Sequence, residues 1–132
     1  MFGLGASIYR EYGFISKDIR RFARSMKKAG EPVVVPLSPE PWAIIRECYA
    51  NCAEMCKRQG GEVIYGWHVY AIPRVFLEAE AHAVWKKPTG ELVDVTPNDV
   101  ETPTIAFIPD ASCTWVEGVS RPIPNRYYPL SR

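Results

Sequence analysis

Residues 75–96 read VFLEAEAHAVWKKPTGELVDVT, and this stretch decides the fold. β-Branched and aromatic residues dominate both ends, while KPTG at residues 87–90 has the composition of a hairpin turn. The stretch therefore predicts two antiparallel strands, at residues 75–86 and 91–96. A three-residue loop places His82 directly opposite Asp94, whereas a two-residue loop makes Asp94 a diagonal neighbour.

Helices are predicted before this hairpin, and further strands around it. Residues 16–29 carry apolar residues at helical spacing behind a serine cap, which predicts an amphipathic helix. A second helical segment, residues 42–59, ends at a Gly-Gly pair. Its start is open, because Ser38 and Pro39 could begin it early or a fresh helix could begin around Glu47. Short strands are expected at 33–35, 62–70 and 104–108.

The chain has the length and composition of one globular domain. It has 132 residues, of which 47% are hydrophobic and 23% charged, and a net charge of +1. These values exclude a disordered tail, a fibrous repeat and a disulfide-dense miniprotein. The order of elements predicts an α+β domain, with N-terminal helices packed on an antiparallel β-sheet. Its parts are a basic helix and proline-rich connector (1–41), a core (42–110) and a C-terminal strap (111–132).

Sequence features also indicate where the protein works. No apolar run approaches the ~20 residues that span a bilayer, and residues 1–6 lack the basic and hydrophobic parts of a signal peptide. We therefore expect a cytoplasmic protein with reduced thiols. Cys48, Cys52 and Cys56 are four residues apart. On a helix the first and third lie about 12 Å apart by rise alone, too far to bind one zinc ion.

The predicted helix at 16–29 has a strongly basic face. Six basic residues and one acidic residue give it a net charge of +5, so the rest of the chain carries −4. Such a face is either a solvated surface or a docking surface for an acidic partner, nucleic acid or an anionic membrane. The basic residues are Lys17, Arg20, Arg21, Arg24, Lys27 and Lys28.

The hairpin brings an imidazole to a carboxylate, and a cysteine lies upstream on a helix. A carboxylate beside His82 would fix its tautomer and stabilise its protonated form, although such a pair is also common as a structural contact. A thiol becomes a nucleophile when a helix N-terminus and a histidine lower its pKa. Cys48 lies nearest the N-terminal end of the second helix if that helix begins around Glu47.

Four short segments carry a resemblance to a known group of enzymes. They are CYAN at 48–51, GG at 60–61, HAVW at 82–85 and GELVDVTP at 90–97. In this order of cysteine, histidine and aspartate the chain resembles the transglutaminase-like and papain-like thiol enzymes, including the NlpC/P60 type. The His-x-x-Trp and Asp-x-Thr-Pro segments look most like the transglutaminase core.

The resemblance implies a papain-like or transglutaminase-like core and a cysteine-dependent amide hydrolase or acyl transferase. Its activity would be that of a peptidase, amidase, deamidase or transglutaminase on a peptide or amide-bearing substrate, without cofactor or metal. Cys48 would be the nucleophile, His82 the base and acid, and Asp94 the residue that orients His82. The chain departs from the family in lacking a Gly-x-Cys-Trp signature. The Cys48 N–H is the first oxyanion donor, and the second is unassigned.

Other residues compete for these roles or add to them. Cys52 is the alternative nucleophile, although it also fits the apolar stripe of a buried helix face. Glu80 shares the face of His82 by strand period and could select an amine-bearing substrate. His68 is expected to be structural, and a metal site made with His82 is the remaining alternative, without the spacing of a known motif. The weaker candidates for substrate binding are Asn51, Trp67, Glu80 and Trp85.

A binding module without catalysis is the rival interpretation. The same fold would then present the basic helix 16–29 to an acidic partner, and binding would weaken with salt. The sequence leaves the oligomeric state open.

Overall fold

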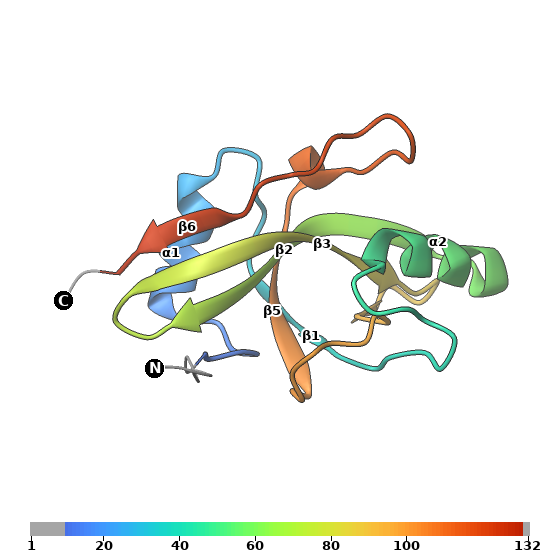
Figure 1. Ribbon diagram of the computed structural model, residues 1–132, viewed down its shortest axis with the longest axis horizontal. Helices are drawn as coiled ribbons and strands as arrows, with labels where there is room; N and C mark the ends of the chain where they lie inside the picture. Colours follow the sequence, from blue (N-terminus) through green and yellow to red (C-terminus); the bar gives the residue numbers. More distant parts are fainter. Residues whose placement is uncertain (1–9, 131–132) are drawn as a thin grey trace, which may run out of the picture.

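The computed structural model describes residues 10–130. Over these residues it has two α-helices, a six-stranded antiparallel sheet and one short 3-10 helix (Figure 1), which confirms the α+β class. The expectation for residues 1–6 and the last two residues of the strap fall outside this part of the chain. The elements are α1 (Lys17–Ser25), β1 (Val33–Pro36), α2 (Cys48–Gln59), β2 (Glu62–Ile72), β3 (Phe76–Lys86), β4 (Leu92–Val93), β5 (Thr104–Pro109), η1 (Ala111–Cys113) and β6 (Arg126–Pro129).

The long β2–β3 ribbon defines two faces of the sheet. The strands are ordered β1-β5-β2-β3-β4, with β6 also paired to β3. Pairing in the ribbon is continuous, from Glu62 opposite Lys86 to Ile72 opposite Phe76. Odd-numbered side chains therefore share one face and even-numbered side chains the other. Both helices pack on the odd-numbered face, in two separate apolar clusters, so the even-numbered face remains free of helices.

The start of α1 follows the sequence, but its end does not. Ser16 caps the helix by accepting a hydrogen bond from the N–H of Ile19 at 3.1 Å. The helix ends at Ser25, four residues short of the prediction, because Met26 leaves helical geometry and packs into the core at 5% exposure. Neither helix among the described residues is long and apolar enough to cross a membrane.

α2 begins at Cys48, which confirms the start around Glu47 and makes the early start at Pro39 wrong. Residues 38–47 form a loop instead. Arg46 has a φ of 68°, a left-handed conformation that cannot belong to an α-helix. The helix thus begins immediately after this turn, and Cys48 becomes its first residue.

The predicted register of the β3–β4 hairpin is wrong. β4 has only two residues, and its loop from β3 is longer than either predicted loop. Asp94 leaves the strand and bridges to Leu37 in the connector. It therefore approaches His82 from beyond the end of β4 rather than from a facing strand position. The facing pairs are Trp85–Val93 and Lys86–Leu92.

The outer edge of β3 has an interruption that positions the site. β6 pairs with residues 76–79 of β3, and β4 pairs with Trp85 and Lys86. Among the described residues, no strand pairs with residues 80–84 on this edge. β6 lies along one half of β3 and α2 lies beside the other half (Figure 1). The N-terminus of α2 can thus approach the strand at His82.

The C-terminal strap is held by its tyrosines. Tyr128 of β6 stacks on Phe22 of α1, with 5.3 Å between the ring centroids. Tyr127 meets Phe76 edge-on at the same centroid distance. The strap therefore ties β3 to α1.

Candidate functional site

The three predicted catalytic residues line one cavity of about 630 Å³. Cys48 comes from the first turn of α2, His82 from β3 and Asp94 from the segment after β4. They meet at the interruption in the β3 edge. The aromatic side chains around them include Tyr12, Tyr49, Tyr70 and Trp115.

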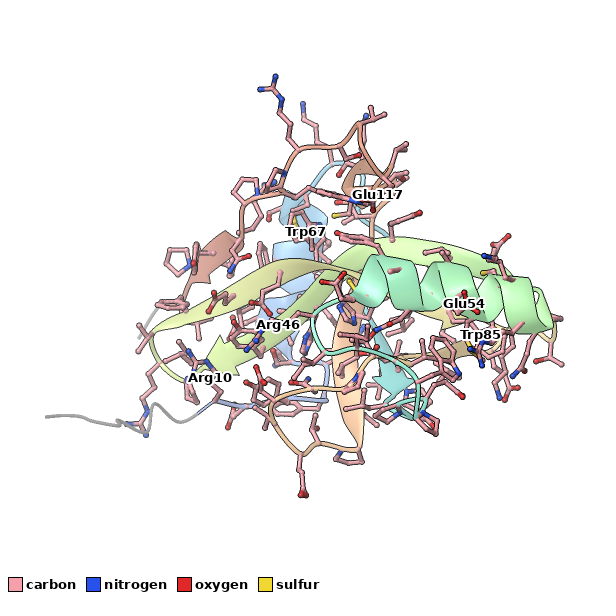
Figure 2. The ribbon with its side chains drawn as sticks, turned by 45° about the vertical axis from the view of Figure 1, so that its right-hand side comes forward. Arg10, Arg46, Glu54, Trp67, Trp85 and Glu117 are labelled. Carbon is pink, nitrogen blue, oxygen red and sulfur yellow. The ribbon has the colours of Figure 1, made fainter. Side chains whose placement is uncertain are left out.

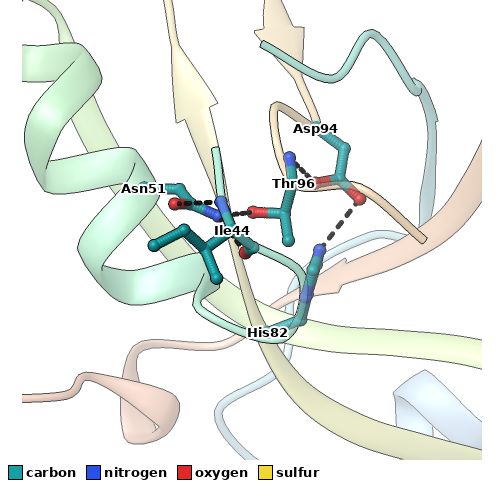
Figure 3. Close-up of polar contacts among 5 residues, drawn as sticks. All are labelled: Ile44, Asn51, His82, Asp94 and Thr96. Atoms are coloured by element: carbon teal, nitrogen blue, oxygen red, sulfur yellow. Dashed lines mark hydrogen bonds and ion pairs between the residues drawn. The ribbon is translucent and has the colours of Figure 1, made fainter. Parts of the chain in front are cut away.

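His82 and Asp94 form a direct hydrogen-bonded pair. The Nε2 atom of His82 lies 2.9 Å from Oδ2 of Asp94 (Figure 3). The Asp94 side chain is 2% exposed and the His82 side chain 14% exposed, so the pair is largely shielded from water. The second oxygen of Asp94 accepts the N–H of Thr96 at 3.2 Å, which fixes the carboxylate. Because Nε2 is engaged by Asp94, Nδ1 is the ring nitrogen left for other contacts.

The environment of His82 favours its protonated form. Burial by itself lowers the pKa of His82, but hydrogen bonds and charge from Asp94 and from the Cys48 side chain outweigh burial and raise the pKa. A thiol and a carboxylate on either side of one imidazole is the arrangement that supports a thiolate–imidazolium pair.

Cys48 and Cys52 have different surroundings. Cys48 is the first residue of α2 and lines the cavity at 7% exposure, where the helix dipole favours negative charge. Cys52 is fully buried one turn further along, and burial raises its pKa. Of the two candidate nucleophiles, the geometry therefore favours Cys48.

Asn51 has a structural role rather than contact with the cavity. Its side chain accepts the N–H of Ile44 at 3.1 Å and donates to the C=O of the same residue at 2.8 Å. It also donates to Oγ1 of Thr96 at 3.0 Å (Figure 3). Asn51 thus joins the loop before α2 to the segment that carries Asp94. These bonds replace the predicted contact with substrate.

The two tryptophans predicted to bind substrate lie elsewhere. Neither Trp67 nor Trp85 is among the described residues that line the cavity. Trp67 is 3% exposed and donates to the carboxylate of Asp110 at 3.0 Å. Trp85 is 4% exposed and donates to the C=O of Gly60 at 2.9 Å, beneath α2 (Figure 2). Both satisfy their indole N–H in the core, as buried tryptophans usually do.

Two polar residues of the ribbon line the cavity beside His82. Glu80 does so as predicted, and His68 of β2 lies directly opposite it. Sequence analysis favoured a structural role for His68, with a metal site shared with His82 as the alternative. The available signal was the two-residue period of a strand. It places Gly66, His68 and Tyr70 on one face of β2, and this is the face that carries His82.

Thr96 is the other residue that sequence reasoning missed. An Asp-x-Thr segment favours a local turn in which the carboxylate accepts the N–H two residues on, and this is the bond observed from Asp94. The long-range bond from Asn51 to Thr96 had no signal in the sequence.

Within residues 10–130, no group of three or more His, Cys, Asp or Glu side chains could hold a metal ion. Comparison of the chain with protein-family models, curated proteins and solved structures finds no match. The site therefore has to be interpreted from its own geometry.

Proposed function

We propose that this protein is a cysteine-dependent amide hydrolase or acyl transferase, with a papain-like or transglutaminase-like arrangement of Cys48, His82 and Asp94. The observation that carries the proposal is the position of His82, whose pKa is raised by Asp94 and by a cysteine at a helix N-terminus. A buried His–Asp pair with a purely structural role would not require a thiol and a cavity beside it.

In the proposed reaction, the Cys48 thiolate attacks the carbonyl carbon of an amide and forms a carbon–sulfur bond. The carbon–nitrogen bond then breaks as protonated His82 gives its proton to the leaving amine. Water or a second amine next attacks the thioester, His82 takes a proton from it, and the thiolate leaves. Asp94 keeps the ring oriented throughout. The backbone N–H of Cys48 supplies one oxyanion donor, since the first N–H groups of a helix lack partners within it.

Alkylation by iodoacetamide tests the nucleophile. An ordinary thiol has a pKa of about 8.5 and is under about 1% ionised at pH 6, so a thiolate–imidazolium pair should react there on the order of 100 times faster than a free thiol. We expect mass spectrometry to find Cys48 modified at pH 6, and the rate to fall at least about tenfold in His82→Ala. Cys52→Ala is the matched control and should leave the rate unchanged. An unreactive Cys48, or a rate independent of His82, would contradict the proposal.

The alternative function, a binding module for an acidic partner, is favoured by one observation. The basic residues of the predicted 16–29 helix are all exposed, and only Arg21 among them forms an ion pair within the described residues, with Asp18 at 3.4 Å. This alternative predicts a partner whose binding weakens with salt and is lost when Arg20, Arg21 and Arg24 become glutamate. In this alternative, the reactivity of Cys48 has no role.

A further inference from the structure

Three pairs of facing residues extend from His82 along the helix-free face of the β2–β3 ribbon. His82 faces Gly66, Glu80 faces His68 and Glu78 faces Tyr70. Facing side chains on an antiparallel pair have Cβ atoms about 4.5–5.5 Å apart. His68 and Glu80 are therefore the immediate neighbours of the proposed base, and both line the same cavity.

His68 carries a buried nitrogen without a partner. The residue is 7% exposed, and its Nε2 forms no hydrogen bond with any described group. Aromatic rings surround it, with centroids 6.0 Å away for Tyr12, 5.7 Å for Tyr70 and 5.6 Å for His82. Burial and then the charge of His82 lower the pKa of His68 to about 3, so the ring is neutral and one nitrogen can accept a hydrogen bond. An unpaired buried nitrogen at a cavity wall calls for a ligand that pairs with it.

Glu80 adds a carboxylate with no ion pair among the described residues. Burial and then the charge of Glu78 raise the pKa of Glu80, whereas the charges of His82, Arg10 and Arg46 lower it; a bound cation would further favour the carboxylate form. Glu78 is already engaged by Asn125 at 2.9 Å and Tyr127 at 3.3 Å. Glu80 is thus the acidic group that remains available to a ligand.

The cations already present do not fill this position. Arg46 pairs with Asp99 at 2.7 Å at the side of the cavity. Arg10 lies with its guanidinium carbon 5.6 Å from the centre of the Tyr70 ring. One ring beside the cavity, that of Tyr70, thus contacts a cation, but neither arginine forms an ion pair with Glu80 among the described residues.

We propose that His68, Glu80 and the rings of Tyr12 and Tyr70 form a specificity subsite for a primary ammonium group of the substrate, next to His82. An ammonium has three donors, which suits one imidazole nitrogen, one carboxylate and an aromatic wall. The inference rests on the proposed function of Cys48 and His82. The ammonium is either a basic side chain of the amide substrate or the protonated form of the acyl acceptor, which loses one proton to water before the free amine attacks the thioester.

Alkylating reagents of different charge test the subsite at Cys48 itself. Bromoethylamine is a cation, iodoacetamide is neutral and iodoacetate is an anion. Each rate at Cys48 is divided by the rate of the same reagent with free N-acetylcysteine. We expect the normalised rate for bromoethylamine to exceed that for iodoacetate by at least about tenfold, and Glu80→Gln to remove most of that preference.

Two further variants separate the subsite from general charge and from the fold. His68→Phe should slow bromoethylamine several-fold more than it slows iodoacetamide, whose rate reports on the Cys48–His82 pair. Glu117→Gln removes an exposed carboxylate that does not line the cavity, and the preference should persist. Equal normalised rates for the three reagents overturn the subsite and leave the proposed nucleophile standing. A Cys48 inert to all three overturns the proposed function and the subsite with it.

A turnover assay distinguishes the two sources of the ammonium. With p-nitrophenyl acetate as acyl donor, added ethylamine should accelerate nitrophenol release and yield N-ethylacetamide if the subsite holds the acyl acceptor. With the p-nitrophenyl ester of Nα-acetyl-lysine as donor instead, ethylamine should slow release, by competing for the subsite, if the subsite holds a basic side chain of the substrate. In Glu80→Gln either effect should shrink several-fold. Indifference of the wild type to ethylamine would count against the subsite.

Discussion

At the scale of single residues, Asn51 fixes the place where α2 begins. Its side chain bonds both backbone groups of Ile44 and the hydroxyl of Thr96, and it is 4% exposed. One buried amide therefore holds the loop before Cys48 against the segment after Asp94. The relative position of Cys48 and Asp94 thus depends on a residue that does not line the cavity.

Replacing Asn51 should cost both stability and reactivity. Asn51→Ala leaves the buried Thr96 hydroxyl and both backbone groups of Ile44 without their partner, so we expect a loss of about 2–3 kcal/mol in urea unfolding. The alkylation rate of Cys48 should fall in the fraction that remains folded. Asn125→Ala, which removes an exposed amide, should cost under about 0.5 kcal/mol. An unchanged unfolding midpoint for Asn51→Ala would contradict this role.

The charge of His82 should make stability depend on pH. Its folded pKa is raised above the ordinary value of 6.5, so its contribution is fully present below that value and declines as pH rises through the folded pKa. Compared with His82→Gln, the wild type should be more stable by about 3 kcal/mol at pH 6, and the difference should shrink towards pH 9.5. Urea unfolding at pH 6, 7.5 and 9.5 measures it. A difference that grows with pH would show that the pair is not held in its charged form.

Contacts between single residues could be predicted from the sequence where they depend on residues nearby in the chain. The contact of His82 with Asp94 was predicted from the hairpin, although the register behind that prediction was wrong. The contact survives because Asp94, once outside β4, is held by its own turn to Thr96. The unpaired nitrogen of His68 could not be predicted, since it depends on rings from three separate segments.

At the scale of elements, α1 depends on the sheet for its stability. It has nine residues, fewer than an isolated helix needs in water. Its apolar residues pack into the buried cluster on the face that carries the odd-numbered side chains of the β2–β3 ribbon. Phe22, at 2% exposure, stacks on Tyr128 and so couples α1 to β6.

Truncation of Phe22 should therefore loosen the strap together with α1. We expect Phe22→Ala to lower the free energy of unfolding by about 3–4 kcal/mol. Arg24→Ala, on the exposed face of the same helix, should change it by less than about 0.5 kcal/mol. The buried residues of the α1 and α2 clusters are distinct, and Tyr65 packs against both, so the alkylation rate of Cys48 in folded Phe22→Ala should stay close to that of the wild type. A loss of Cys48 reactivity would show that the two clusters are coupled.

The helices illustrate which element boundaries a sequence defines. Ser16 begins α1 because a capping hydroxyl acts within one turn. The start of α2 stayed open between Pro39 and Glu47, since both fit local rules. Two features make α2 begin at Cys48: the left-handed turn at Arg46 and the hydrogen bonds of Asn51. Asn51 bonds Thr96, which is distant in the sequence.

At the scale of the whole molecule, the site is assembled from distant segments. The α+β class followed from the order of helices and strands, and that order is visible in the sequence. The path of residues 36–47 was not, because a proline-rich connector has no periodicity to indicate its neighbours. The C=O of Pro36 accepts the N–H of Asp94, and the N–H of Ser38 donates to the C=O of Asp94, so the connector is held against the segment that carries Asp94.

The interruption in the edge of β3 also bears on how copies of this protein meet in solution. An unpaired strand edge recruits foreign strands and so promotes aggregation. Here the unpaired stretch covers only residues 80–84, between β6 and β4, and the start of α2 lies against it. A strand from another chain would gain at most a short ladder before it met its flanking neighbours. The unpaired stretch of β3 is thus too short to serve as a template for fibre growth.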